Sequence, residues 1–88
     1  MANYKIYIKP SAVKEIESLP KRDRTRVIQK IQGLTADPRP PGCEKLTGEE
    51  KFRIRQGRYR IVYSIQDKEL VIVVVKIGHR REVFIKAT

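Results

Sequence analysis

The stretch that most constrains the fold runs from Lys51 to Ile65 and reads KFRIRQGRYRIVYSI. Apolar and polar side chains alternate on both sides of Gln56-Gly57, and successive side chains of a strand leave opposite faces. Such alternation around a glycine-containing pair predicts a β-hairpin with one buried face. That face would carry six apolar residues: Phe52, Ile54, Tyr59, Ile61, Tyr63 and Ile65.

The other face of this hairpin is basic. Residues 51–60 include five basic side chains and no acidic one. Like charges side by side repel, so they stabilise a sheet poorly. The whole chain carries a net charge of +10 with a pI of about 10.1. A polyanion, either nucleic acid or an acidic protein, is therefore the expected partner.

The first forty residues predict one strand and two helices. Alternation over residues 4–8 indicates a strand with Tyr4, Ile6 and Ile8 inward. A short helix is expected from the N-cap Ser11 to Leu19, and a second one follows Pro20 over residues 21–36. Apolar residues at helical spacing give the expected buried stripes: Val13, Ile16 and Leu19 in the first helix, and Val27, Ile28, Ile31 and Leu34 in the second.

The second helix has a basic exposed face. Its cations are Lys21, Arg22, Arg24, Arg26 and Lys30, relieved only by Asp23. Such a run of charges usually indicates a helix face that is simply exposed to solvent. The alternative is that it forms a second basic patch.

The last third of the chain predicts an interior strand. Residues 70–77 are β-branched and continuously apolar, which is typical of a strand that is covered on both faces and central in its sheet. Gly78 is expected to release this strand into a turn. His79, Arg80 and Arg81 would then lie near the arginine face of the hairpin.

These elements predict an α+β fold in the order β-α-α-β-β-β, formed by residues 1–88 as a single domain. A small, mainly antiparallel sheet would carry the N-terminal helical hairpin on one face. The opposite face would be open, concave and lined by arginines.

The cysteine content and the hydropathy of the sequence argue against a disulfide-bonded, metal-binding, membrane-spanning or secreted protein. Cys43 is the single cysteine, so no internal disulfide is expected and a reducing, cytoplasmic setting is the default. One cysteine and one histidine fall short of a tetrahedral metal site. The longest apolar run is far shorter than a membrane span, and no secretory signal is visible.

The ordered set of motifs resembles the RelE branch of the RelE/ParE toxin superfamily. The motifs that carry the resemblance are Lys45-Leu46-Thr47-Gly48, Phe52-Arg53-Ile54-Arg55, Tyr59-Arg60-Ile61-Val62-Tyr63 and Gly78-His79-Arg80-Arg81-Glu82-Val83-Phe84. The resemblance implies the toxin of a type II toxin–antitoxin pair, which would cut mRNA in the A site of the 70S ribosome beside rRNA. It also implies a partly disordered, RelB-like antitoxin in a hetero-oligomeric complex, and no cofactor.

The resemblance also implies site residues. The two basic side chains of the family's second strand fall on Arg53 and Arg55, and the arginine of the next strand falls on Arg60. The arginine after the last strand falls on Arg80, with Arg81 a second candidate. Phe84 stands where the family often has a tyrosine, so it keeps base stacking but has no hydroxyl for proton transfer. Lys45, Arg58 and Phe84 are the expected substrate-binding residues.

The chemistry of the residues agrees with this in part. Guanidinium groups suit the charge of a phosphorane, but they stay protonated and cannot act as a base. Histidine is the side-chain type suited to general-base catalysis near neutrality, which makes His79 the candidate base; a polar histidine in a turn is the alternative. Lys45 could serve only with a depressed pKa. Two other functions remain open: a ParE-like inhibitor that binds DNA gyrase, and a weakly active RNA-binding homologue of the toxin.

Overall fold

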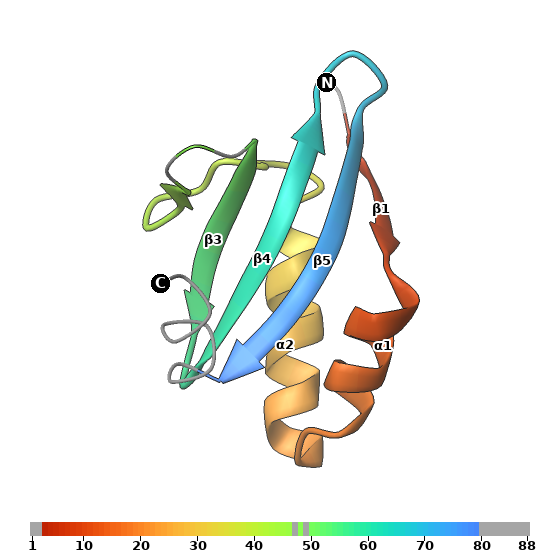
Figure 1. Cartoon of the computed structure of the whole chain (residues 1–88), viewed down its shortest axis with the longest axis vertical. Helices are drawn as coiled ribbons and strands as arrows, with labels where there is room; N and C mark the ends of the chain where they lie inside the picture. The colour runs from red at the N-terminus through yellow and green to blue at the C-terminus, as the bar shows by residue number, and fades with distance from the viewer. Residues whose placement is uncertain (1–2, 47, 49, 80–88) are drawn as a thin grey trace.

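The chain forms one five-stranded sheet whose strand order is β1-β5-β4-β3-β2. The computed structural model describes residues 3–46, 48 and 50–79. Along the chain the elements are β1 (Lys5–Ile8), α1 (Pro10–Glu17), α2 (Lys21–Gly33), β2 (Glu44–Lys45), β3 (Lys51–Gln56), β4 (Tyr59–Gln66) and β5 (Val71–His79). β1 runs parallel to β5, and the other neighbours are antiparallel. Both helices lie behind the sheet in Figure 1, which confirms the predicted α+β arrangement.

The predicted hairpin is present with the register that its turn dictates. Gln56 is paired with Tyr59, so two residues, Gly57 and Arg58, make the connection. Gly57 has φ +61°, whereas Arg58 has a negative φ, the pattern of the type II′ turns whose twist matches that of paired strands. A glycine at the first turn position adopts this φ at little steric cost.

β5 is an interior strand, as predicted, because it pairs with β1 on one side and with β4 on the other. Both predicted ends were wrong. The strand starts at Val71 because Leu70 has φ +56°, a left-handed conformation that ends the preceding turn. Gly78 does not release the strand: it pairs with Arg60, and His79 pairs with Tyr59, because β4 is long enough to offer partners to both.

The core lies between the helices and the sheet. The sheet contributes Ile54, Ile61, Tyr63, Ile72, Val74 and Ile77, and the helical segment contributes Ala12, Ile16, Val27, Ile31 and Leu34. Tyr4, Ile6, Ile8 and Leu19 pack against this cluster, as predicted. Val13 and Ile28 were predicted to be buried but are each 37% exposed, and Ala12 takes the place expected for Val13.

α1 differs from prediction at both ends, since it also ends at Glu17 and not at Leu19, and α2 differs at one end. α1 begins at Pro10 rather than after Ser11, because the fixed φ of proline suits the first helical position. α2 begins at Lys21 as predicted but ends at Gly33, three residues before the predicted end at Ala36. Leu34 then caps the helix and is still buried in the core. None of the helices in the described ranges is long and apolar enough to cross a membrane.

A carboxylate of α1 covers the edge of β5 where β1 ends. The Glu15 carboxylate accepts hydrogen bonds from the backbone N–H of Ile77 at 2.9 Å and from Lys76 Nζ at 2.8 Å. Exposed strand edges invite pairing with other chains, and Glu15 occupies this one. The end of β5 is thereby fixed to α1.

The connection between α2 and β2 is fastened to the core by Tyr63. This side chain is fully buried, and its hydroxyl donates to the carbonyl of Pro38 at 2.8 Å. The hydroxyl also lies 3.4 Å from the Cys43 sulfur. Burial, and secondly the contact with Cys43, raises the pKa of Tyr63 far above its usual range. The hydroxyl therefore stays protonated and remains a donor.

An ion pair joins the α2–β2 connection to the β4–β5 turn. Arg39 reaches both carboxylate oxygens of Asp67, at 3.3 and 2.9 Å, and its guanidinium lies 5.2 Å from the centre of the Phe52 ring. The Tyr4 hydroxyl donates to the same carboxylate at 2.7 Å. The hydrogen bond from Arg39, followed by that from Tyr4, lowers the pKa of Asp67.

We expect Tyr63→Phe to lower the free energy of unfolding by about 1–2 kcal/mol, because the part-buried hydrogen bond to the Pro38 carbonyl is lost. Urea unfolding followed by circular dichroism measures this change. Tyr7→Phe is the matched control, since Tyr7 is 55% exposed and its hydroxyl makes no hydrogen bond within the described residues. Its change should stay within about 0.5 kcal/mol. Equal effects of the two variants would contradict the role given to Tyr63.

We expect Asp67→Asn to reduce the loss of stability in acid. The folded-state pKa of Asp67 lies below its ordinary value of 3.8. Its stabilising contribution is therefore complete above that value and is lost as the pH falls through the folded-state pKa. The difference between urea midpoints at about pH 6 and about pH 3 should be smaller in the variant than in the unchanged protein. Glu69→Gln, in the same turn, should leave the difference unchanged; an undiminished difference in Asp67→Asn would refute the assignment.

Candidate functional site

Three arginines share the face of the sheet that the helices leave uncovered. Arg55 pairs directly with Arg60. Two residues further along the same strands, Arg53 pairs with Val62. Residues that pair directly across antiparallel strands point to the same face. The intervening pair, Ile54 with Ile61, is buried on the helix side. Arg53, Arg55 and Arg60, three of the arginines assigned to the site by the family resemblance, therefore share one face. The fourth, Arg80, lies outside the described residues.

These side chains line a hollow of about 380 Å³ together with the end of the α2–β2 connection. We call it the arginine hollow, and its lining residues are Gly42, Cys43, Glu44, Arg53, Arg55 and Arg60. One wall is formed by β3 and β4, and the other by residues 42–44. The second wall is held by the contact of Cys43 with the buried Tyr63.

Glu44 is the carboxylate of the arginine hollow. It pairs with Arg53 in the sheet, and its Oε1 accepts from Arg53 Nη2 at 2.9 Å. That hydrogen bond and the charge of Arg53 hold the pKa of Glu44 below its usual range, with smaller contributions from Arg60 and Arg55. A carboxylate of this kind stays ionised, so it orients Arg53 and is a weak proton acceptor. The Arg53 side chain is only 22% exposed, and its Nε is buried without a hydrogen-bond partner in the described part of the chain.

Arg55 and Arg60 add two further cations to the lining of the arginine hollow. They are direct cross-strand partners, and like charges placed this way destabilise a sheet. Arg55 is exposed and has no ion pair among residues 3–46, 48 and 50–79. On the other side of Arg60, its partner in β5 is Gly78, which adds no side chain to this face. The arrangement favours an anion between the two guanidinium groups.

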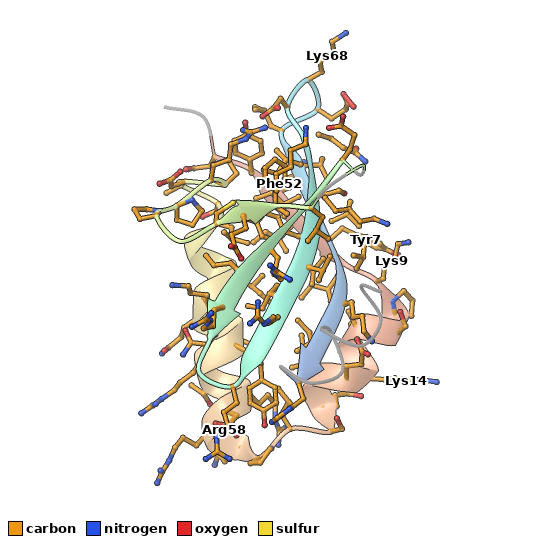
Figure 2. The ribbon with its side chains drawn as sticks, turned by 60° about the vertical axis from the view of Figure 1, so that its left-hand side comes forward. Tyr7, Lys9, Lys14, Phe52, Arg58 and Lys68 are labelled. Carbon is orange, nitrogen blue, oxygen red and sulfur yellow. The ribbon has the colours of Figure 1, made fainter. Side chains whose placement is uncertain are left out.

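A smaller hollow, of about 80 Å³, lies at the tip of the hairpin. It is lined by Arg55, Gly57, Arg58, Tyr59 and Arg60. Arg58 is exposed, and Figure 2 shows it projecting from the tip, away from the body of the sheet. The predicted substrate-binding residue Arg58 therefore lies next to the arginine hollow rather than in its lining.

His79 was predicted to lie near the arginine face, and that prediction was wrong. It pairs with Tyr59, and the two rings meet edge to face with centroids 5.8 Å apart. The Tyr59 hydroxyl donates to Asp23 of α2 at 3.1 Å, which places this pair on the helix side of the sheet. Burial, and then this hydrogen bond, raises the pKa of Tyr59. Because the strand continues through Gly78, it is the glycine and not the histidine that lies opposite Arg60.

Lys45 also lies away from the arginine hollow. It pairs with Phe52, whose side chain points to the face opposite that of Arg53. Its ammonium group lies 3.9 Å from the Glu50 carboxylate, and both side chains are exposed. The neighbouring Glu44, which sequence reasoning missed, takes the position in the hollow. No sequence signal could have found it, because Glu44 is assigned to the arginine face only by the two-residue pairing of β2 with β3.

Three predicted site residues, Arg80, Arg81 and Phe84, lie outside the described residues. The site that the structure defines therefore consists of Arg53, Arg55 and Arg60, with Glu44 as the partner of the first. Within the described ranges, no group of three or more histidine, cysteine, aspartate or glutamate side chains is placed to hold a metal ion. Guanidinium groups in this geometry can bind a phosphodiester and stabilise additional negative charge on it.

Known proteins are similar to this chain in both sequence and fold. The family model described as the ParE toxin of the type II toxin–antitoxin system, parDE, matches residues 6–84. A RelE-like toxin protein of Escherichia coli is 30% identical over 80 residues, which cover 88% of this chain and 83% of that protein. Toxin RelG of Mycobacterium tuberculosis is 27% identical over 85 residues, covering 92% and 95%.

Solved structures agree with these matches. In the RelBE2 toxin–antitoxin complex of M. tuberculosis, the matching chain is 26% identical with a TM-score of 0.79, covering 89% of this chain and 99% of that one. In the archaeal RelE–RelB complex of Pyrococcus horikoshii, the identity is 31% and the TM-score 0.77, with coverage of 89% and 96%. From the family match, the relatives and the shared fold together, the chain belongs to the RelE/ParE superfamily of type II toxin–antitoxin toxins.

Proposed function

We propose that this toxin is a ribosome-dependent mRNA endonuclease that cuts mRNA in the ribosomal A site and so stops translation. The observation that carries the proposal is the convergence of Arg53, Arg55 and Arg60, from two strands, on one hollow of about 380 Å³. Two of these side chains are direct cross-strand neighbours of like charge, an arrangement that a fold does not need for its own stability. A phosphodiester would relieve their repulsion.

The reaction that fits this hollow is attack of a ribose 2′-hydroxyl on the adjacent phosphorus. The 2′-oxygen forms a new bond to phosphorus while the bond from phosphorus to the 5′-oxygen breaks. The products are a 2′,3′-cyclic phosphate and a free 5′-hydroxyl. One proton leaves the attacking hydroxyl and one is delivered to the departing 5′-oxygen. The intermediate phosphorane carries extra negative charge on its non-bridging oxygens.

The arginines act on that charge. Arg55 and Arg60 would bind the non-bridging oxygens, and their guanidinium groups can do so with paired hydrogen bonds. Arg53, oriented by Glu44, would complete the cradle from the β2 side. Donors aimed at a developing charge each contribute about two to three powers of ten in rate. Guanidinium groups keep their protons near neutrality, so this hollow supplies charge and orientation and the ribosome would help to position the mRNA.

Residues beyond the described ranges complete the proposal. Arg80, with Arg81 as the alternative, would add a further cation to the phosphate, and Phe84 would stack on a base. His79 faces Tyr59 on the helix side, so the general-base role considered for it loses its geometric support. The single domain of residues 1–88 would act in the cytoplasm, where ribosomes are.

We also propose an antitoxin partner. The similar M. tuberculosis and P. horikoshii chains are each found in complexes with a RelB-type antitoxin. A net charge of +10 suits a partner with an acidic, partly disordered segment, which could order on the toxin surface. An antitoxin segment bound over the arginine face would offset the positive charge of the toxin. It would also block access of RNA to the arginine hollow.

A second candidate function is the inhibition of DNA gyrase by protein binding. The match to the ParE family model favours it, because that branch shares the fold without a need for nuclease chemistry. Mapping the damage after induction separates the two functions. New mRNA ends within A-site codons support the nuclease, whereas DNA breaks without such ends support the gyrase inhibitor.

We expect Arg60→Ala and Arg55→Ala each to lower the rate of A-site mRNA cleavage by about 100- to 1,000-fold, because each removes one donor from the phosphorane charge. Primer extension on mRNA after timed induction measures the cleavage, and growth measures the toxicity. The double variant should fold at least as well as the unchanged protein, since it loses a like-charge pair.

Lys68→Ala is the matched control for these variants. Lys68 is an exposed cation at the β4–β5 turn, and Figure 2 shows it at the end of the molecule opposite Arg58. Its removal should leave both cleavage and toxicity unchanged. Full cleavage by the Arg55→Ala and Arg60→Ala variants would rule out the arginine hollow as the reacting site.

A further inference from the structure

Two hollows lie side by side on the sheet and share a wall. The arginine hollow and the smaller hollow at the hairpin tip are both lined by Arg55 and Arg60. The smaller one, which we call the tip hollow, is completed by Gly57, Arg58 and Tyr59. An anion in either hollow would therefore lie beside the same two guanidinium groups.

The two hollows differ in what they can hold. The arginine hollow, of about 380 Å³, falls within the range of about 300–1,000 Å³ that is usual for small-molecule sites. The tip hollow, of about 80 Å³, is far below that range. The first is large enough for a nucleotide, whereas the second can hold only a single small group.

The turn of the hairpin keeps the tip hollow open. Gly57 has no side chain that could fill it, and its φ of +61° belongs to the type II′ turn. The Tyr59 hydroxyl donates to Asp23 of α2 at 3.1 Å, which holds this side chain towards the helix side of the sheet. Gly57 and Arg58 are both exposed, so a small group can enter the tip hollow from solvent.

The lining of the tip hollow is positively charged. Three arginines contribute to it, and no carboxylate of the described residues does, whereas the arginine hollow includes Glu44. Arg58 makes no ion pair with any residue in the described ranges, and Figure 2 shows it at the tip of the hairpin. Its guanidinium group is therefore available to an anion in the tip hollow.

Phosphate is the anion that this arrangement favours. Guanidinium groups bind phosphate through paired hydrogen bonds, and a nucleotide strand carries its phosphates one nucleoside apart. An acidic peptide could also present two anions, and the aromatic Tyr59 suits either ligand. A peptide carboxylate, however, would leave most of the 380 Å³ of the larger hollow empty, whereas a nucleoside would occupy it.

We propose that the tip hollow is a second phosphate subsite, so that the two hollows together bind the phosphates on the two sides of one ribonucleoside. The inference deepens the proposed function and rests on it for the assignment of the arginine hollow to the reacting phosphate. Arg58 would bind the neighbouring phosphate and orient the nucleotide, without contact with the reacting atoms. The smallest ligand with this chemistry is a nucleoside 3′,5′-bisphosphate, either free or as part of a single strand.

Isothermal titration calorimetry of the full chain with adenosine nucleotides tests this inference. We expect adenosine 3′,5′-bisphosphate to bind at least about tenfold more tightly than the 3′- or the 5′-monophosphate at about 0.05 M salt, because its second phosphate gains charge-assisted hydrogen bonds. The 2′-O-methylated trinucleotide ApApA cannot be cut and carries a phosphodiester on each side of its central nucleoside. Binding of this trinucleotide as tightly as the bisphosphate identifies a strand as the ligand, and binding confined to the bisphosphate identifies a free nucleotide.

The variant Arg58→Gln removes the one arginine that lines the tip hollow alone. Its preference for the bisphosphate should fall to about threefold or less, while its affinity for each monophosphate stays within about twofold of that of the unchanged protein. A loss caused by net charge alone would instead weaken the binding of all the nucleotides together. Because Arg58 is exposed in a turn, the thermal midpoint should not change.

The matched control is Arg22→Gln. Arg22 is exposed at the start of α2, which Figure 1 shows at the same, lower end of the molecule as the β3–β4 turn, and it lines neither hollow. This control should keep the full preference for the bisphosphate. Equal binding of bisphosphate and monophosphates by the unchanged protein would overturn the proposal, as would equal effects of the two variants. Competition by poly-glutamate as strong as by the bisphosphate, at equal charge, would overturn it in favour of an acidic peptide.

The same preparations separate this inference from the proposed function. A protein that loses its bisphosphate preference through Arg58→Gln but leaves no A-site mRNA ends keeps the second subsite and loses the nuclease. A protein that cuts through Arg55 and Arg60 but binds bisphosphate and monophosphates equally keeps the nuclease and loses the second subsite.

Discussion

The structure depends on the register of the β3–β4 hairpin. The two-residue turn at Gly57-Arg58 pairs Gln56 with Tyr59, and every later pair follows from it. A slip of one residue would turn each side chain to the other face. If β3 slipped, Ile54 would face solvent and Arg55 would be driven into the core. If β4 slipped, the same would happen to Ile61 and Arg60. The same register thus buries the apolar side chains and places the arginines on the opposite face. Whenever the core forms, the β3–β4 wall of the hollow forms with it.

Much of this was predictable because the period of two is explicit in residues 51–65. The hairpin, the grouping of Arg53, Arg55 and Arg60, and the inner faces of Ile61 and Tyr63 all follow from alternation. Element ends were less predictable because they depend on partners that are distant in the sequence. Gly78 remains in β5 since Arg60 is available to pair with it, and no local signal conveys that. The error then placed His79 on the wrong face.

The same limit explains why Glu44 was missed. Its two-residue strand has no recognisable period, and its position is set by pairing with Arg53 and by the hydrogen bonds of Tyr63 to the preceding connection. The hollow consequently has one wall that sequence pattern determines and one that tertiary contacts determine. Glu44 accepts a hydrogen bond from Arg53, whereas Arg55 is exposed and has no ion pair within the described residues. Charge is thus distributed unevenly inside the site, with the neutralised end at β2.

The parallel pairing of β1 with β5 affects when the fold can form during synthesis. Lys5 to Ile8 pair with Val71 to Val74, and the intervening residues include every other element of the sheet. Such distant contacts form late, because a long loop must close before they contribute. A nascent chain on the ribosome therefore cannot complete its sheet until residues 71–74 have left the exit tunnel. The sheet would therefore stay incomplete until late in translation, after β3 and β4 have already been made.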